Sequence, residues 1–315
     1  MDTKQVSRED MIRFAENGIG NYIRLNREAR NYSQQDVCDG ICSVSRFSRV
    51  EMGERVVDYQ TIEAFLDRMK IDRASYEFVL DEEDYGGYKH REKIEVLITE
   101  KKYEQAEQEL NVYQKRYSTK KLQGQFYSFQ SARLERAKEE PDKEKMKRLF
   151  EDALTVTAKD YQRKLEEREI LSNLELECIT ELIYCIENSV EREDKQQKLY
   201  QYFQWSRERE RFFAFAFRAA MLYYAETLYE NRKFDLCIQV CNEVLDIYYG
   251  TSKLGDRAKV FFLRAKARQA RGRKEEEDLY FRDLKTAYYT FSFYDGEESA
   301  IKKQIEEEYG WLFTE

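Results

Sequence analysis

The chain has little of what turns and β-structure require. Its 315 residues include one proline and 12 glycines. Because tight turns depend on proline and glycine, this scarcity argues against a strand-rich fold and predicts an all-α protein. The length is sufficient for two domains with ample buried surface. Aromatic residues make up 14% of the chain, which argues against disorder even though 37% of the residues are charged.

Other absences restrict the location and the chemistry. No apolar run approaches the ~20 residues that a membrane-spanning helix needs, and residues 1–6 lack the apolar core of a signal peptide. We therefore expect a cytoplasmic protein with no membrane partner. There is a single histidine, and the cysteines fall into pairs spaced by four or seven residues, which fits buried thiols better than a zinc site. We expect no metal and no cofactor. The pairs are Cys38/Cys42, Cys178/Cys185 and Cys237/Cys241.

A basic excess is also absent, since 62 acidic residues outnumber 54 basic ones and the net charge is −8. Most of the surface should therefore repel DNA. Any contact with DNA would require a local basic patch rather than the charge of the whole chain.

Residues 33–53 have the pattern of two short helices joined by a tight turn. Ser33 is suited to cap the first helix, Gly40 permits the turn, and Ser43 is suited to cap the second helix. In that second helix Phe47 and Val50 would face the core. Arg is suited to bidentate recognition of guanine, and a side chain at the start of the first helix is well placed for a phosphate. The predicted DNA-binding residues are Gln34, Ser43, Val44, Ser45, Arg46 and Arg49.

Other helices complete this predicted head. They are expected at 19–30, 59–69 and 74–80, and Glu51 is expected to pair with Arg24 or Arg27 of the first of them.

The run Gly-Ile-Cys-Ser-Val-Ser-Arg-Phe-Ser-Arg-Val-Glu-Met-Gly, residues 40–53, resembles the helix-turn-helix of Cro/C1-type (XRE) regulators. More narrowly, it is similar to the Rgg/PlcR-like branch of peptide-pheromone receptors, over about residues 19–71. The branch usually has proline after the last glycine, where this chain has Glu54. The resemblance implies that residues 1–80 form a DNA-binding domain.

An acidic segment with adjacent glycines, residues 81–88, is predicted as a linker. Beyond it, residues 97–106 are similar to residues 228–237: an apolar helix end, a basic turn, an aromatic residue, then a small residue. This pattern is typical of a tetratricopeptide repeat. We therefore predict a tetratricopeptide-like α-solenoid over 89–315, with Pro141 in the first turn of a helix. Its units are expected at 89–122, 123–157, 162–200, 212–250 and 256–294, with a capping helix at 297–313.

Stacked helix pairs form a superhelix whose concave face is lined by the first helix of each pair. Aromatic, amide and basic side chains on that face would suit an extended peptide, because amides both donate and accept hydrogen bonds and cations bind carboxylates. The predicted peptide-binding residues are Phe129, Arg133, Asn173, Leu222, Tyr229, Phe262, Lys266 and Gln269.

A DNA-binding head followed by tetratricopeptide repeats resembles the architecture of the Rgg/PlcR family. The resemblance implies a quorum-sensing transcriptional regulator: a homodimer that binds double-stranded operator DNA under the control of a short peptide. The alternative is an interaction adaptor whose solenoid holds a partner protein, with DNA binding secondary. An enzyme is not expected, because the chain has no glycine-rich phosphate loop, nucleophile elbow or metal-spaced cluster.

Overall fold

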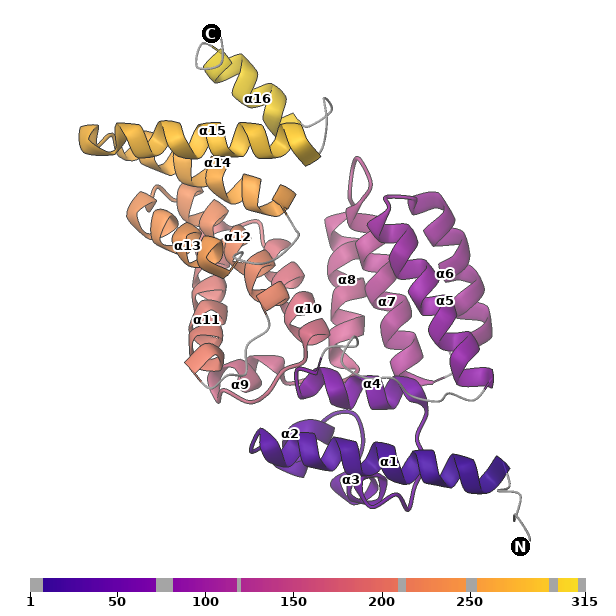
Figure 1. Ribbon diagram of the computed structural model, residues 1–315. Helices are drawn as coiled ribbons and strands as arrows, with labels where there is room; N and C mark the ends of the chain where they lie inside the picture. Colours follow the sequence, from indigo (N-terminus) through magenta and orange to yellow (C-terminus); the bar gives the residue numbers. More distant parts are fainter. Residues whose placement is uncertain are drawn as a thin grey trace, which may run out of the picture. The chain divides into compact units, whose positions relative to one another are not determined.

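The computed structural model describes residues 8–71, 82–117, 120–208, 214–247, 254–294 and 300–310, and these residues contain helices and no strand (Figure 1). The prediction of an all-α protein is confirmed. The helices are α1 (Arg8–Ala29), α2 (Gln34–Cys38), α3 (Val44–Glu51), α4 (Tyr59–Arg68), α5 (Glu82–Thr99), α6 (Tyr103–Tyr117), α7 (Lys121–Arg136), α8 (Lys143–Thr155), α9 (Tyr161–Glu166), α10 (Asn173–Tyr184), α11 (Ser189–Glu208), α12 (Ala214–Glu230), α13 (Phe234–Ile247), α14 (Leu254–Arg271), α15 (Glu277–Tyr294) and α16 (Ala300–Tyr309), with a 3-10 turn at Lys274–Glu276.

The chain forms two compact units. The first comprises Met1–Cys185 with Trp205–Phe213, and the second comprises Ile186–Gln204 with Ala214–Glu315. The division therefore falls inside the third predicted repeat, 162–200, rather than at residues 81–88. The head and the first repeats belong to one unit because buried ion pairs and hydrogen bonds join them, as described below.

The head is built from α1 to α4 around one apolar core. Ile23, Phe47 and Phe65 are completely buried, and the rings of Phe47 and Phe65 meet edge to face with centroids 4.7 Å apart. The first helix is longer than the predicted 19–30, since α1 begins at Arg8. The helix predicted at 74–80 lies outside the described residues.

The repeat helices pair as predicted in four of the five predicted repeats. In the first unit of the structure α5 packs on α6 and α7 on α8, and in the second α12 packs on α13 and α14 on α15. The third repeat is irregular: the short α9 precedes α10, which packs on α8, whereas α11 packs on α12 through ring contacts such as Phe203–Phe217 at 5.4 Å. Helix α16 packs on α15 and buries Ile305, as expected of a capping helix.

The two similar sequence segments adopt the same backbone geometry. Lys101 and Arg232 follow α5 and α12 in the left-handed region, with φ of 60° and 58°. The next residues donate backbone hydrogen bonds to Leu97 at 2.9 Å and to Leu228 at 2.8 Å, which is the helix-ending motif that satisfies a free carbonyl. The small residues that follow, Ala106 and Cys237, are both completely buried. The repeat relation is therefore structural as well as sequential.

Two local predictions are corrected. The predicted linker 81–88 is largely helical, because α5 begins at Glu82 and includes Gly86 and Gly87. Both glycines lie close to Tyr117 of α6; a Cβ at Gly86 would be 3.4 Å from its hydroxyl, so the absence of a side chain permits close packing of α5 on α6. Pro141 lies before Asp142, the N-cap of α8, and not in the first turn.

We predict that Lys101→Gly raises the free energy of unfolding by about 0.5–1 kcal/mol, because glycine adopts positive φ without the steric cost of a Cβ. Lys101 is exposed, so little packing is lost. Urea denaturation followed by circular dichroism measures the change. The matched control is Lys102→Gly, whose backbone is not left-handed. An equal gain in that control would contradict the explanation.

Candidate functional site

Helix α3 is fixed by its buried face and presents a polar face. Ser43 caps it, and its hydroxyl accepts a hydrogen bond from the Arg46 backbone nitrogen at 3.3 Å. Phe47 and Val50 anchor the helix in the core of the head. The predicted DNA-binding side chains on α3 lie outside that core. Ser43, Val44, Ser45 and Arg49 are exposed, and Arg46 is half-buried.

An ion-pair network stiffens the inner side of the same helix. The carboxylate of Glu51, at the end of α3, accepts hydrogen bonds from Arg27 at 2.6 Å and from the amide of Gln34 at 2.7 Å. The predicted pairing of Glu51 with Arg27 is confirmed, whereas Arg24 donates to Asn21. The hydrogen bond that Arg27 donates to Glu51 raises the pKa of Arg27. The amide nitrogen of Gln34 therefore faces Glu51, and its contact with a DNA phosphate stays a prediction.

Close backbone approach also sets the position of α3. Gly20 of α1 is buried against the last turn of α3. A Cβ at Gly20 would lie 2.2 Å from the carbonyl oxygen of Val50. A side chain there would push α1 away from α3. Sequence reasoning missed Gly20, although a glycine within a predicted helix is a signal of such an approach.

Arginine side chains gather around the start of α3, although the chain carries a net negative charge. The pKa of the Cys42 thiol is lowered to about 7, first by a hydrogen bond with Cys38 and also by the charges of Arg46 and Arg55. Arg49 and Arg55 are both exposed in this region. The local basic patch that DNA contact would require is therefore present next to the exposed serines.

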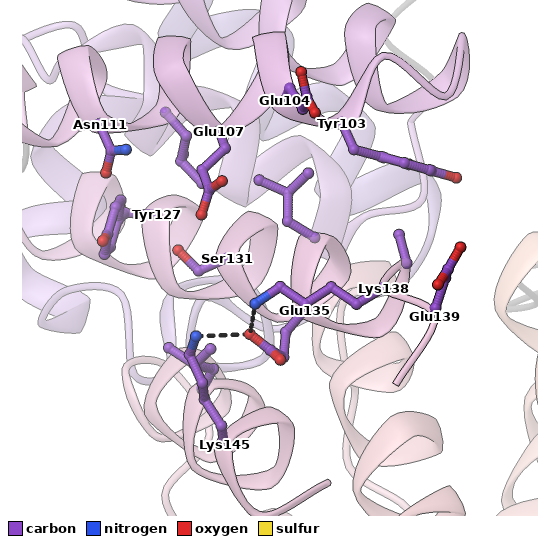
Figure 2. A pocket seen from close by; sticks show the side chains of 14 residues that line it. Tyr103, Glu104, Glu107, Asn111, Tyr127, Ser131, Glu135, Lys138, Glu139 and Lys145 are labelled. Carbon is purple, nitrogen blue, oxygen red and sulfur yellow. Dashed lines mark hydrogen bonds and ion pairs between the residues drawn. The ribbon is translucent and has the colours of Figure 1, made fainter. Parts of the chain in front are cut away.

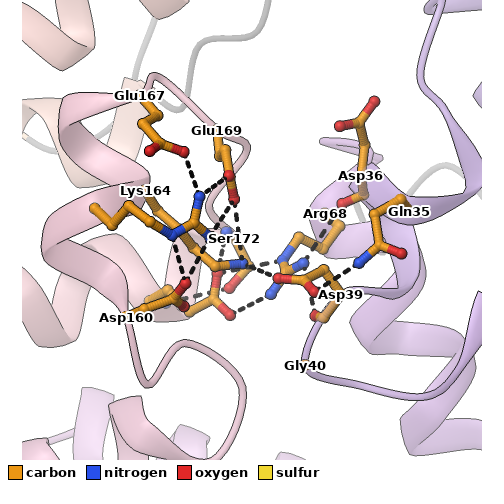
Figure 3. Close-up of polar contacts among 12 residues, drawn as sticks. Gln35, Asp36, Asp39, Gly40, Arg68, Asp160, Lys164, Glu167, Glu169 and Ser172 are labelled. Carbon is orange, nitrogen blue, oxygen red and sulfur yellow. Dashed lines mark hydrogen bonds and ion pairs between the residues drawn. The ribbon is translucent and has the colours of Figure 1, made fainter.

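A buried ion pair attaches the head to the repeat helices within the first unit. Arg68 of α4 donates to both carboxylate oxygens of Glu175 of α10, at 2.5 and 3.2 Å, and each side chain is only 1% exposed. Arg68 also donates to the carbonyl oxygen of Asp39 at 3.0 Å, in the turn that leads to α3. Glu175 in turn accepts the backbone N–H of Ser172 at 2.8 Å, in the capping box of α10 (Figure 3).

Further contacts hold the same turn (Figure 3). Lys164, itself buried, pairs with the Asp39 carboxylate, and Lys121 donates to the carbonyl oxygen of Gly40 at 2.6 Å. Gly40 has a φ of 69°, and a Cβ there would lie 1.9 Å from the carbonyl oxygen of Thr157. Glycine is thus required at position 40 for two reasons. The backbone has a positive φ there, and the residues after α8 leave no space for a side chain. Sequence reasoning explained only the first requirement.

In the first unit, the predicted peptide-binding residues lie on α7 and α10. Phe129 is buried against Phe150, and the Arg133 guanidinium lies 5.8 Å from the Phe129 ring centroid. Asn173 is the first residue of α10: its backbone N–H donates to Asp67 of α4 at 3.1 Å, and its side-chain amide donates to Glu177. The side-chain oxygen of Asn173 is buried and accepts no hydrogen bond from a described residue.

In the second unit, the structure brings three of the predicted residues together. The Lys266 ammonium of α14 lies 5.2 Å from the ring centroid of Tyr229 of α12 and 5.5 Å from that of Phe262. The side-chain oxygen of Gln269 accepts a hydrogen bond from Tyr309 at 2.8 Å, and Leu222 is half-buried. The contacts therefore bring Arg133 beside Phe129 in the first unit, and Lys266 beside Tyr229 and Phe262 in the second.

Neither a bilayer-spanning helix nor a metal-binding cluster occurs in the described residues: no helix there is long and apolar enough, and no three His, Cys, Asp or Glu side chains converge. All six cysteines are free thiols. Four of them are buried, and Cys42 and Cys185 are half-buried.

Comparison with known proteins finds similarity of fold. No protein-family model matches the chain, and no curated protein matches its sequence. PlcR of Bacillus thuringiensis, solved in complex with the peptide PapR7 and DNA, is 15% identical over 95% of this chain and 100% of that one, with a TM-score of 0.52.

Two other solved structures match with lower TM-scores. ComR of Streptococcus vestibularis in its apo form is 15% identical, covering 95% of this chain and 99% of that one, with a TM-score of 0.45. The SHP pheromone receptor Rgg2 of Streptococcus dysgalactiae is 14% identical, covering 93% and 99%, with a TM-score of 0.41. The chain thus has the fold of PlcR, in which a helix-turn-helix head precedes tetratricopeptide-like repeats.

Proposed function

We propose that the chain is a DNA-binding transcriptional regulator whose repeats sense a short signalling peptide. The observation that carries the proposal is the outer face of α3: exposed serines and Arg49 beside Arg46, with Arg55 nearby, in an acidic protein. A fold shared with a protein that was solved with both peptide and DNA supports it. The proposed partners are double-stranded operator DNA, a short peptide and a second copy of the chain, in the cytoplasm, and no catalytic role is proposed.

In this proposal residues 1–80 act as the DNA-binding domain, with α3 in the major groove. Arg46 and Arg49 read guanine, while Ser43 and Ser45 bond to bases or phosphates. The Arg27–Glu51 ion pair keeps α3 in a fixed orientation, so little ordering is required on binding. A homodimer would present two such helices to half-sites about 34–36 Å apart, or a multiple of that spacing.

The peptide is proposed to bind the repeats, which span 89–315, through the residues predicted from the sequence. Lys266 between Tyr229 and Phe262, and Arg133 on Phe129, each present a cation beside an aromatic ring. Such cations bind the carboxylates of a peptide, and the rings bind its apolar side chains. The side-chain oxygen of Asn173 is buried without a hydrogen-bond donor, and in this proposal it accepts a peptide N–H when peptide binding exposes it.

Within the first unit, short contacts connect the proposed peptide site with the proposed reading helix. Asn173 is bonded to Asp67 of α4, and two residues further on Glu175 pairs with Arg68, which bonds to Asp39 next to the turn before α3. A peptide regulates DNA binding only if it binds one arrangement of these contacts more tightly than another. We propose that the Arg68–Glu175 pair is the element that couples the two sites.

The double substitution Arg46→Ala and Arg49→Ala is expected to reduce specific DNA affinity by about 2–6 kcal/mol, because each bidentate base contact contributes about 1–3 kcal/mol. The measurement is fluorescence anisotropy with a duplex selected by the wild-type protein from a random pool, with circular dichroism to check helical content. The charge-matched control is Lys147→Ala and Arg148→Ala, both exposed on α8. An unchanged affinity in the α3 variant would rule out α3 as the reading helix.

We expect Arg133→Met to weaken binding of a peptide selected by the wild-type protein by about 1.5–3 kcal/mol, since a charge-assisted hydrogen bond is lost while packing on Phe129 is kept. Calorimetry measures the affinity, and DNA binding without peptide should not change. The control is Arg148→Met on α8. Equal peptide affinity in both variants would remove Arg133 from the site.

Replacing one partner of the buried pair, as in Glu175→Gln, is expected to lower the free energy of unfolding by about 3–5 kcal/mol, because Arg68 is left buried without its counter-ion. The double variant Arg68→Met, Glu175→Leu should recover most of that stability and yet lose the effect of peptide on DNA affinity. Urea denaturation and anisotropy give the two readouts. A double variant that folds and still responds to peptide would contradict the coupling role.

The same pair predicts a pH dependence. Burial opposes ionisation of Glu175, but Arg68 outweighs this effect and lowers the pKa of the carboxyl below its usual 4.5. The pair therefore contributes its stability above pH 4.5 and loses it as the pH falls through the lowered pKa. The double variant should show a weaker loss of stability over this acid range than the wild type in urea denaturation.

A further inference from the structure

A pocket of about 440 Å³ lies among α6, α7 and α8 of the first unit, and the function proposed above does not use it (Figure 2). Its volume is within the range of ligand sites, roughly 300–1,000 Å³. All the residues that line it are described. Tyr103, Glu107 and Asn111 come from α6, while Tyr127 and Ser131 belong to α7.

The pocket is separate from the face of α7 that is proposed to bind the signalling peptide. Tyr127, Ser131 and Glu135 line the pocket at intervals of four residues, which places them on one face of α7. Arg133 is two residues beyond Ser131, which places it about 200° around the helix. The two sites therefore lie on opposite sides of α7, and a ligand in one leaves the other accessible.

The lining carries an excess of negative charge. Four glutamates and two lysines face the pocket, for a net charge of −2. Both lysines are engaged by one carboxylate: Glu135, only 4% exposed, accepts hydrogen bonds from Lys138 at 2.8 Å and Lys145 at 2.6 Å. Burial opposes ionisation of Glu135, but these two hydrogen bonds outweigh it and lower its pKa to about 2.

The remaining glutamates, Glu104, Glu107 and Glu139, are exposed and form no salt bridge with any described residue, so water alone solvates their charges at the mouth of the pocket. Figure 2 shows the Glu107 carboxylate directed towards Ser131. The amide of Asn111 and the hydroxyl of Ser131 add further hydrogen-bonding groups in the same hollow. A cation of a ligand would satisfy the excess charge.

The apolar part of the lining restricts which cation fits. Leu110 and Leu134 are buried side chains at the pocket wall, and the half-buried Tyr127 lines the pocket from α7. A guanidinium is planar, stacks on an aromatic ring and bonds to a carboxylate at the same time, and its aliphatic stem packs on leucine. A compact, strongly hydrated ammonium matches these groups less well.

We propose that this pocket binds an arginine side chain from a basic segment of a partner protein. Glu107 and Glu104 accept hydrogen bonds from the guanidinium, Tyr127 stacks on it, and Leu110 and Leu134 contact its methylene groups. The repeats thereby have a protein-interaction surface in addition to the proposed peptide and DNA sites, and this surface does not depend on either of them.

The test uses the full chain and a fluorescein-labelled blocked peptide, Gly-Leu-Arg-Leu-Arg-Gly, compared with the same peptide in which citrulline replaces each arginine. Citrulline keeps the shape of arginine and removes its charge. We expect the arginine probe to bind at least about tenfold more tightly in fluorescence anisotropy, since hydrogen bonds between charged groups are the strong ones. The variant Glu104→Gln, Glu107→Gln should lose this preference.

The control is Glu144→Gln, Glu151→Gln, which removes the same charge from exposed positions on α8 outside the pocket. It should retain the preference for arginine, as should Arg133→Met, and circular dichroism should show that all variants are folded. Equal binding of the two probes by the wild type would overturn the proposal. An equal loss in the control would also overturn it, because attraction to the acidic chain as a whole would then explain the binding.

Discussion

Of the buried ion pairs that join the head to the repeat helices, Arg68–Glu175 is the most deeply buried. Arg68 and Glu175 are both removed from water, and each would be costly to bury alone, so the two elements that carry them must meet. The same arginine bonds to the backbone of Asp39, and the same glutamate completes the capping box of α10. The side chains of Arg68 and Glu175 therefore hold together four parts of the first unit: the end of α4, the turn before α3, the loop after α9 and the start of α10.

The local charge near α3 differs in sign from the net charge of the chain. The chain is acidic, yet Arg46, Arg49 and Arg55 gather around the start of α3, and after the hydrogen bond with Cys38 the charges of Arg46 and Arg55 help to lower the pKa of the Cys42 thiol. On the repeats the reverse holds, since the pocket among α6, α7 and α8 has carboxylates in excess of its lysines. The proposed DNA surface and the proposed arginine site thus select ligands of opposite charge, which keeps a basic partner away from the reading helix.

Local patterns in the sequence predicted the elements that depend on neighbours in the chain. Ser33 and Ser43 cap their helices as expected, Phe47 and Val50 face the core, and Arg27 meets Glu51. The repeat signature predicted the turns at Lys101 and Arg232, and the structure shows that both residues have positive φ. The prediction of a linker at 81–88 was wrong because Gly86 and Gly87 were interpreted as a helix break. Both lie inside α5, where the absence of a side chain permits close packing on Tyr117. The predicted DNA- and peptide-binding residues stay predictions, to be decided by binding measurements.

By itself, the sequence determined the fold class, the helix-turn-helix and the pairing of the regular repeats, because caps, periodicity and turn residues act over a few positions. The tertiary structure alone decided that Arg68 meets Glu175, 107 residues away, and that Gly40 lies against Thr157. It also decided that Glu135 pairs with both lysines of the pocket among α6, α7 and α8, so that the other carboxylates of this pocket have no ion pair. Such contacts join side chains that no spacing rule relates, since their partners are chosen by the packing of whole helices.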